Sequence, residues 1–291
     1  MKISTSLGHA MKVEGVSARE SARMMKLAGF DAVDMNLTHD MMDNAKILTD
    51  EWAQKVYDEA EALKAEGLEI GQCHLPYYPG HLPLPGDGSV QAFVDLVAES
   101  WAHAIEVAGQ VGCPVAVLHL FLDMNADAEV TYEGNVRLIE QLMPALKKWN
   151  VKLALENCYG YKGGYIDGHA VRPEDILEIL SRTDAEYVGA CIDTGHANIF
   201  RINSGRMARM YGSRLIALHV NGNAGGDSHG VPYSFAGDRQ DYYDFSAALK
   251  EIGYKGSYNL EVDVGSMPKG CGQPYLNFAA AIARGLANLA E

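Results

Sequence analysis

Ionisable side chains follow apolar, strand-like runs at six places along the chain, which read QCHLPYY, VLHLF, LALENC, ACIDTGHAN, IALHVNGN and NLEVD. The ionisable residues in these segments are His74, His119, Glu156, Asp193, His196, His219 and Glu261. A charged group at the end of a buried strand is costly unless it is paired or bound to a metal. The nearest basic residues after these strands are Lys162, Arg201 and Arg239. Ion pairing therefore explains the cluster poorly, and a bound cation explains it better.

The ligand types narrow the choice of metal. Carboxylates and imidazoles favour Mn²⁺, Mg²⁺, Co²⁺, Fe²⁺ or Zn²⁺ over the soft ions that prefer thiolates. The acids of the cluster are Glu156, Asp193 and Glu261, which with one dication leave a single net negative charge. A site of this charge tolerates neutral polyols and keto groups as ligands of the metal.

These residues require a fold that gathers many strand ends on one face. Short β-rich runs predict strands over residues 2–8, 31–37, 68–75, 114–120, 152–157, 188–194, 215–221 and 257–262. The amphipathic stretches between them predict helices over residues 17–28, 49–66, 90–111, 131–149, 173–182, 205–211, 241–252 and 274–291. Eight β/α units predict a parallel sheet closed into a (β/α)₈ TIM barrel, with its chemistry at the C-terminal ends of the strands.

Local signals agree with this assignment. Ser17 and Glu20 have the spacing of a capping box, and Gly29 is a natural helix terminator. A doubly wound open sheet is the alternative, but no GxGxxG motif follows the first strand. No linker or shift in composition divides the chain, so we expect residues 1–291 to form a single domain.

The composition is that of an ordinary globular protein, with 48% hydrophobic and 21% charged residues. The net charge of −14 argues against a non-specific nucleic-acid-binding protein. The five cysteines are widely spaced without a CxxC motif, which indicates neither a disulfide scaffold nor a cysteine-rich zinc site. No signal-peptide core and no run of ~18–20 apolar residues is present, so we expect a cytoplasmic protein without membrane contact.

Six short motifs give the sequence a recognisable order. They are HLPY at 74–77, LEN at 155–157, DTGHAN at 193–198, HVNGN at 219–223, DSH at 227–229 and LEV at 260–262. In their order and their placement at strand ends, the chain resembles the xylose-isomerase-like superfamily of sugar isomerases and epimerases, which also contains endonuclease IV-type enzymes. The resemblance covers nearly the whole chain.

The resemblance implies functional roles for five residues. Glu156, Asp193, His219 and Glu261 would together hold one divalent cation, such as Mn²⁺, Co²⁺, Mg²⁺ or Zn²⁺. His196 would contact the substrate. In the isomerase and epimerase members, the two metal-binding glutamates also move protons, so the catalytic residues would be Glu156, Glu261 and His196. Barrels of this superfamily often pair through exposed helices and loops, so a homo-oligomer is one expected state.

Five further residues are assigned to substrate binding. They are His74, His119, Tyr77, Asp227 and His229. All but Tyr77 also match positions that complete the three-zinc cluster of the nuclease members. Without a role in binding, the histidines would be core residues, Tyr77 would be a packing residue, and Asp227 would shape a turn.

One departure from the superfamily bears on the substrate. Ketose 3-epimerases commonly place an arginine a few residues after the seventh-strand histidine. Here His219 is followed by Val-Asn-Gly-Asn-Ala-Gly-Gly, which argues against a ketohexose substrate. The expected partner is a small carbohydrate or a ketone derived from one.

The predicted reaction is proton transfer next to a carbonyl, through an enediolate that the metal stabilises. One glutamate would remove the proton, the other would return it, and His196 would stabilise the developing oxyanion. Three other functions remain open: a dehydratase or lyase acting on an inositol- or sugar-derived ketone, a zinc-dependent abasic-site endonuclease, and a sugar-binding barrel without catalysis. The acidic charge and the lack of an Arg/Lys-rich loop disfavour the nuclease.

Overall fold

The computed structural model describes residues 1–8, 14–37, 43–77, 90–121, 127–162, 165–167, 171–263 and 267–291. Most of the Pro-rich loop expected after the third strand, residues 78–89, lies outside the described part of the chain.

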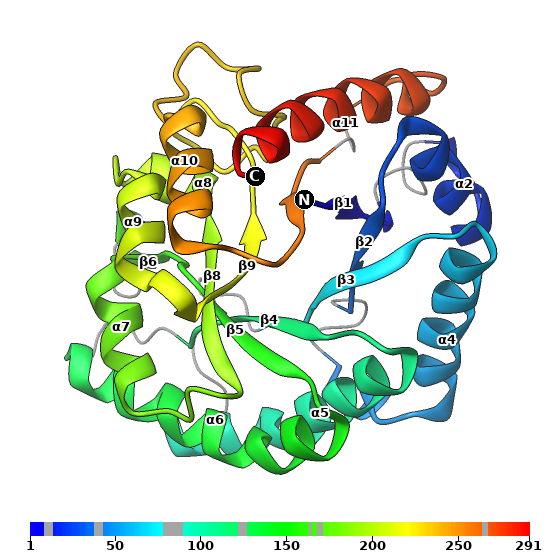
Figure 1. Ribbon diagram of the computed structural model, residues 1–291. Coiled ribbons are helices and arrows are strands. Elements are labelled where there is room, and N and C mark those ends of the chain that lie inside the picture. The colour runs from blue at the N-terminus through cyan, green and yellow to red at the C-terminus, as the bar shows by residue number, and fades with distance from the viewer. Residues whose placement is uncertain are drawn as a thin grey trace.

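Eight parallel strands form a barrel that is nearly closed (Figure 1). In chain order they are β1 (Ile3–Ser6), β2 (Ala32–Asn36), β3 (Glu69–His74), β4 (Val115–His119), β5 (Lys152–Glu156), β8 (Val188–Asp193), β9 (Leu215–His219) and β10 (Tyr258–Leu260). Their order in the sheet is β10-β1-β2-β3-β4-β5-β8-β9. Two hydrogen bonds join the remaining edges, from Val220 N to Asn259 O at 2.9 Å and from Glu261 N to Val220 O at 3.1 Å. The predicted (β/α)₈ barrel is confirmed.

Helices surround the barrel and cover the outer face of its strands (Figure 1). They are α2 (Ala18–Ala28), α4 (Asp50–Ala65), α5 (Val90–Val111), α6 (Ala128–Trp149), α7 (Pro173–Ser181), α9 (Ser204–Tyr211), α10 (Tyr242–Ile252) and α11 (Gly272–Leu289). Their ends follow local chemistry. The Ser17 hydroxyl accepts a hydrogen bond from Glu20 N at 3.3 Å, and Gly29 ends α2 with a φ of 99°, a conformation that favours glycine.

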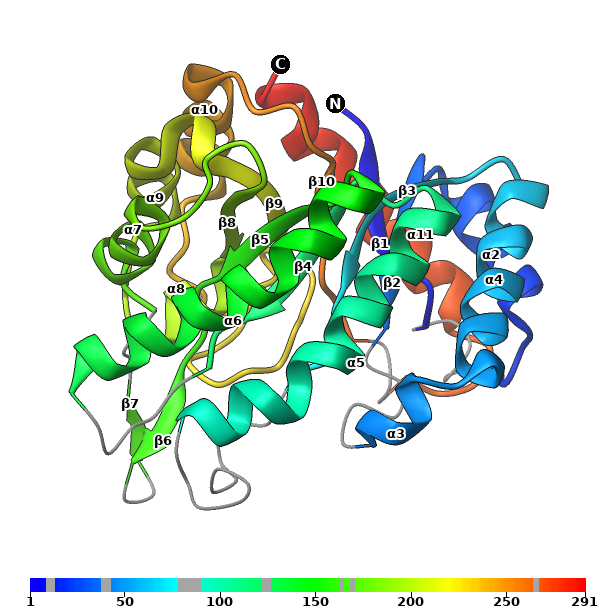
Figure 2. The ribbon, with the colours of Figure 1, turned by 90° about the horizontal axis from the view of Figure 1, so that it is seen from below.

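Four short elements were not expected from the sequence. They are α3 (Asn44–Ile47), α8 (Thr194–Ile199), the 3₁₀ turn η1 (Gly212–Arg214) and the antiparallel hairpin of β6 (Gly160–Lys162) and β7 (Tyr165–Asp167). They are too short for an amphipathic period to develop. Figure 2 shows α3 and the hairpin at one end of the barrel and both chain termini at the other.

Two apolar layers hold the architecture together. The larger one lies between the strands and the helices. The smaller one fills the barrel interior with Val117, Ala154, Cys191 and Ala217, all fully buried. Because side chains alternate along a strand, the row that contributes Ala154 to this layer places Glu156 one step further toward the C-terminal end. In the described part of the chain, no helix combines the length and apolar character needed to cross a membrane.

A buried acid on α4 gives this fold a pH-dependent stability. Glu59 is only 6% exposed, and burial raises its pKa from 4.5 to about 7, although Lys55 opposes the shift. The folded state therefore keeps a proton that the unfolded chain releases above pH 4.5. Stability is lost as pH rises through this window, by up to about 3 kcal/mol above pH 7.

We expect Glu59→Gln to raise the melting temperature at pH 8 and to flatten its dependence on pH between about 5 and 8. Thermal unfolding followed by circular dichroism across that range measures both effects. Glu61→Gln, on the exposed side of the same helix, is the matched control and should keep the wild-type profile. Identical pH profiles for Glu59→Gln and wild type would contradict the prediction.

Candidate metal centre

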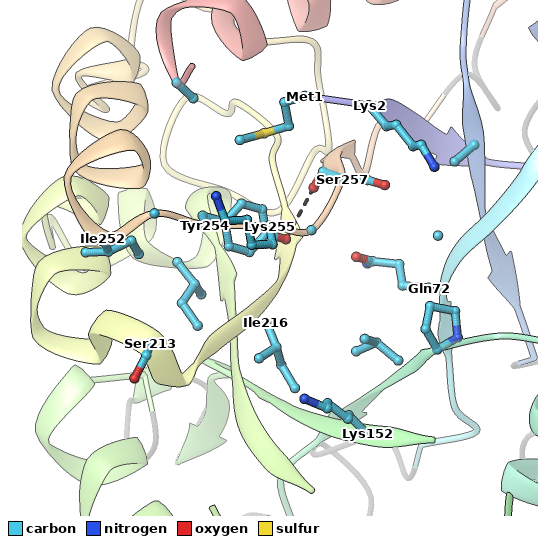
Figure 3. A pocket seen from close by; sticks show the side chains of 18 of the residues that line it. Met1, Lys2, Gln72, Lys152, Ser213, Ile216, Ile252, Tyr254, Lys255 and Ser257 are labelled. Carbon is cyan, nitrogen blue, oxygen red and sulfur yellow. Dashed lines mark hydrogen bonds between the residues drawn. The ribbon is translucent and has the colours of Figure 1, made fainter. Parts of the chain in front are cut away.

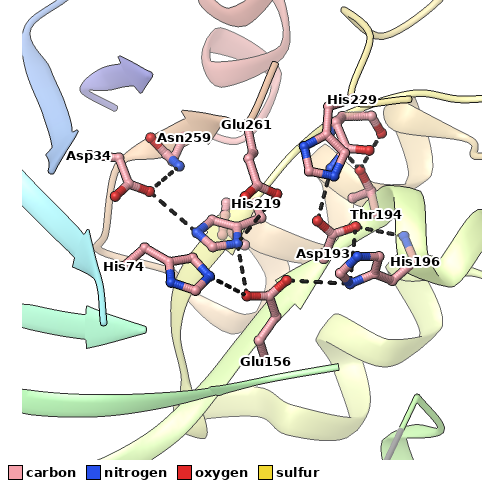
Figure 4. A network of polar contacts seen from close by, with 12 residues as sticks. Asp34, His74, Glu156, Asp193, Thr194, His196, His219, His229, Asn259 and Glu261 are labelled. Atoms are coloured by element: carbon pink, nitrogen blue, oxygen red, sulfur yellow. Dashed lines mark hydrogen bonds and ion pairs between the residues drawn. The ribbon is translucent and has the colours of Figure 1, made fainter. Parts of the chain in front are cut away.

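Four predicted metal ligands converge at the C-terminal ends of the strands (Figure 4). Glu156, Asp193 and His219 are the last residues of β5, β8 and β9, and Glu261 follows β10 directly. Each of the four offers one ligand atom, and these atoms all lie within 4.8 Å of one another. Glu156, Asp193 and His219 are fully buried, whereas the Glu261 side chain is 20% exposed. The parallel register therefore brings together donors that are far apart in the sequence.

Most of the donor atoms have no hydrogen-bond partner among the described residues. Both Glu156 carboxylate oxygens, His219 Nδ1 and Glu261 Oε2 are buried without a hydrogen-bond partner among the described residues. His219 Nδ1 lies 3.0 Å from Glu156 Oε2 and 3.5 Å from Glu261 Oε2. No lysine or arginine of the described segments forms an ion pair with Glu156, Asp193 or Glu261. Buried oxygens and an imidazole nitrogen left open in this way fit a divalent cation of the Mn²⁺, Co²⁺, Mg²⁺ or Zn²⁺ type.

The electrostatics of the four residues agree with this fit. Burial, reinforced by the negative charges of Glu261 and Glu156, raises the pKa of Asp193 to about 8 although His196 opposes it. Burial alone would lower the pKa of His219, but Glu261 and Glu156 raise it well above its usual value. The negative charge of the three carboxylates thus exceeds the positive charge that the one imidazole of the cluster can supply. A bound cation would relieve this repulsion.

A buried polar network contacts the Nε2 atom of His219 and orients its ring. Its Nε2 lies 3.3 Å from Asp34 Oδ2 on β2. The same oxygen accepts hydrogen bonds from Gln72 Nε2 at 2.8 Å and from Asn259 Nδ2 at 2.9 Å. Ser4 Oγ donates to Asn259 Oδ1 at 2.8 Å. A carboxylate behind a metal-binding histidine fixes the ring and raises its basicity. Sequence reasoning missed this network, although polar residues inside apolar strands were its visible signal.

Two asparagines hold Asp193 in place. Asn157 Oδ1 accepts from Asp193 N at 2.7 Å, and Asn157 Nδ2 donates to Asp193 O at 2.9 Å. Asn221 Nδ2 donates to Asp193 Oδ2 at 2.8 Å. The other carboxylate oxygen accepts from His196 N at 2.6 Å and thereby starts α8. Asp193 therefore acts as a helix cap as well as a member of the metal cluster.

His196 connects the cluster to the DSH segment. Its Nδ1 lies 2.9 Å from Asn157 O and 3.3 Å from Glu156 Oε1, and its Nε2 lies 3.7 Å from Asp227 Oδ2. Asp227 Oδ1 lies 2.7 Å from His229 Nε2. Although burial opposes it, the negative charges of Glu261 and Asp227 raise the pKa of His229 to about 10. The segment expected to bind substrate therefore borders the cluster.

Tyr159 is a further neighbour that the sequence did not reveal. It donates a hydrogen bond to Asp227 Oδ2 at 2.9 Å, and its ring lies edge-on to the ring of His196 with the centroids 5.0 Å apart. It precedes the β6–β7 hairpin directly. A tyrosine in a loop carries no motif, so only the fold places it at the site.

The remaining predicted residues line the opposite side of Glu156. His74 Nε2 and His119 Nε2 lie 3.6 Å and 3.2 Å from Glu156 Oε2. The Tyr77 ring lies 4.4 Å from the His119 ring, measured between centroids. The structure thus brings together every residue that the sequence placed in the site; their roles stay predictions.

The site also contains three further sets of donors with metal-binding spacing. They are His74 with Glu156 and His219, His119 with Glu156 and Cys158, and His196 with Asp227 and His229. Cys158 is buried, and burial raises its pKa well above the usual value, which argues against a role as a free nucleophile. The donor-rich region therefore extends beyond the four-residue cluster.

We expect Asp34→Asn to weaken metal binding by about 10–100-fold, because His219 loses the carboxylate behind its ring. Competition of the metal-loaded protein with a chelator, with the metal counted by elemental analysis, measures the affinity. Asp58→Asn, on the exposed face of α4, is the matched control and should bind like wild type. Wild-type affinity in a folded Asp34→Asn variant would rule out this role.

Two solved structures resemble nearly the whole chain. A D-tagatose 3-epimerase-like protein superimposes with a TM-score of 0.72 at 19% identity, covering 99% of this chain and 98% of its own. The 3-keto-D-glucoside 4-epimerase YcjR from E. coli gives a TM-score of 0.73 at 16% identity, covering 98% and 99%. At these identities the likeness shows the fold.

Sequence comparison supplies the family. A curated relative, the uncharacterized protein y4fM of Sinorhizobium fredii, is 26% identical over 166 residues, which is 54% of this chain. The match spans 50% of that relative's length. The family described as xylose isomerase-like TIM barrel matches residues 22–287. The chain belongs to the xylose isomerase-like TIM-barrel family.

Proposed function

We propose that the protein is a divalent-metal-dependent isomerase or epimerase acting on a sugar or a sugar-derived ketone. The observation that carries this proposal is the convergence of Glu156 and Glu261 on His219 Nδ1, at 3.0 Å and 3.5 Å. Glu156 Oε1, Glu156 Oε2 and Glu261 Oε2 are buried and accept no hydrogen bond from any described residue. Two carboxylates that flank one position can remove a proton from one face of a substrate and return it on the other. The structural relatives named above are called sugar epimerases or epimerase-like.

Each residue of the cluster would have a defined task. Glu156, Asp193, His219 and Glu261 would hold the cation, which when bound supplies Lewis-acid polarisation of a carbonyl or hydroxyl. One glutamate would take the proton next to the carbonyl, and the other would deliver it. His196, whose pKa lies well above its usual value because the negative charges of Asp193 and Glu156 outweigh burial, would donate to the developing oxyanion.

The surroundings of the cluster favour an uncharged substrate. Three carboxylates and one dication leave a negative centre, and the described site residues include no lysine or arginine that would bind a phosphate. His74, His119, Tyr77, Asp227 and His229 provide hydrogen-bonding groups around Glu156 and His196, which suits the hydroxyls of a sugar. The substrate would therefore be a neutral polyol, ketose or keto-sugar.

We expect wild-type protein loaded with Mn²⁺ or Co²⁺ to incorporate solvent deuterium into one member of a ketose and keto-sugar panel. Glu156→Gln and Glu261→Gln should reduce this exchange by about 10²–10⁴-fold, because each removes a proton-transferring group. Mass spectrometry of the recovered sugar measures the exchange, and the metal is counted on the same samples. Glu61→Gln on the surface of α4 is the control. Exchange that persists at the wild-type rate in both glutamate variants would refute the assignment.

A second candidate, a zinc-dependent abasic-site endonuclease, is favoured by one observation. The three additional donor sets lie next to the four-residue cluster and share Glu156 or neighbour it through His196. A multinuclear metal site suits hydrolysis of a phosphodiester, because one metal can activate water while others stabilise the leaving oxygen. The net charge of −14 disfavours contact with nucleic acid.

Counting metal separates these functions. For the isomerase or epimerase we expect about one tightly bound metal per chain by elemental analysis, and less in Glu261→Gln. Nearly three zinc ions per chain together with cleavage of an abasic-site oligonucleotide would establish the nuclease instead. Release of water or of a leaving group from the same sugar panel would identify a dehydratase or lyase. Stable sugar binding without any turnover would leave a binding module.

A further inference from the structure

The barrel has a hollow at the mouth opposite the metal centre. It measures about 870 Å³ and is bordered by the starts of β1, β3, β5 and β9 and by the turn before β10 (Figure 3). On β5 the alternating row of side chains runs from Lys152 at this mouth through Ala154 to Glu156 at the metal centre. Four residues of strand separate the two sites, which is about 13 Å. The hollow is therefore a second site, distinct from the metal centre.

The apolar layer inside the barrel divides the two sites. Val115 and Ile216 line the hollow and pack on the buried cluster of Val117, Ala154, Cys191 and Ala217. On the floor, a Cβ on Gly71 would lie 2.9 Å from Ser257 Oγ, so the glycine keeps the space beside that hydroxyl open. A ligand in the hollow would meet the apolar side chains of Val115 and Ile216, the Ser257 hydroxyl and the Gln72 side chain (Figure 3).

The charge around this mouth is opposite to that of the whole protein. Acidic residues outnumber basic ones by 38 to 24 in the chain, yet four lysines and only two glutamates line the hollow. Both glutamates have partners, since Glu69 Oε2 lies 2.5 Å from Lys2 Nζ and Glu291 contacts the amino group of Met1. The other three lysines, Lys152, Lys250 and Lys255, form no ion pair with any described residue. The mouth thus keeps three uncompensated positive charges.

We infer that the N-terminal mouth of the barrel binds a small dianion, either a phosphate group or a dicarboxylate. Three lysines around a hollow supply the charge, the Ser257 hydroxyl supplies a hydrogen bond, and the limited volume admits a small molecule. Ammonium groups bind such anions as point charges, without the fixed geometry that arginine imposes. The site needs no metal and stands independently of the sugar chemistry proposed for the opposite face.

Calorimetric titration of the metal-loaded protein at low ionic strength tests this site, with inorganic phosphate and succinate as separate probes. We expect wild type to bind at least one probe, and the triple variant Lys152→Gln, Lys250→Gln, Lys255→Gln to bind it at least about tenfold more weakly. Whether phosphate alone, succinate alone or both probes bind tells which anion chemistry the mouth accepts. No binding of either probe to wild type overturns the inference.

Two control variants locate the binding. A control triple variant removes the same charge from exposed positions outside the hollow, through Lys55→Gln, Lys64→Gln and Lys269→Gln. It should bind like wild type. An equal loss in both triple variants would show a general charge effect and overturn the inference. Glu261→Gln should leave binding unchanged. Binding that is lost in Glu261→Gln but kept in the lysine variant would place the anion at the metal centre and also overturn it.

Discussion

The burial of Glu156 is the constraint on which the rest of the site depends. This carboxylate is fully buried, and neither of its oxygens has a hydrogen-bond partner among the described residues. Burial alone would raise its pKa, yet the charges of His219 and His119 hold it well below its usual value. An ionised carboxylate in such surroundings is tolerated only when cationic groups gather around it. The histidines supply part of that charge, and a bound cation would supply the rest.

The barrel makes this arrangement possible by separating functions along its axis. On β5 a lysine, an alanine and a glutamate occupy successive positions of one inward-facing row. The alanine joins Val117, Cys191 and Ala217 in a small buried apolar layer between the two mouths. One end of the same row is therefore free to carry positive charge while the other carries negative charge. The fold keeps these opposite potentials about 13 Å apart.

The part of the interior near β1, β2, β3 and β10 is polar instead. Asp34 Oδ2 accepts hydrogen bonds from Gln72 and Asn259 there and lies 3.3 Å from His219 Nε2. Gln72 also donates to Leu218 O at 3.2 Å, which ties the network to strand β9. Burying these polar groups costs free energy, and their role in fixing the orientation of the His219 imidazole accounts for that cost. The side of the barrel that positions the predicted metal ligand His219 is thus polar, and the opposite side is packed with small apolar residues.

The sequence by itself determined the number and order of the strands and the residues at their C-terminal ends, because continuous apolar runs ending in an ionisable residue are visible locally. The gathering of those residues on one face followed from the parallel topology. Only the tertiary structure decided that Asp34 lies 3.3 Å from His219 Nε2, that Tyr159 reaches Asp227, and that Lys152 lines a hollow at the opposite mouth. Those relations depend on strand register, barrel closure and loop paths. These are fixed by contacts between segments far apart in the chain, so no single segment specifies which partner a residue meets.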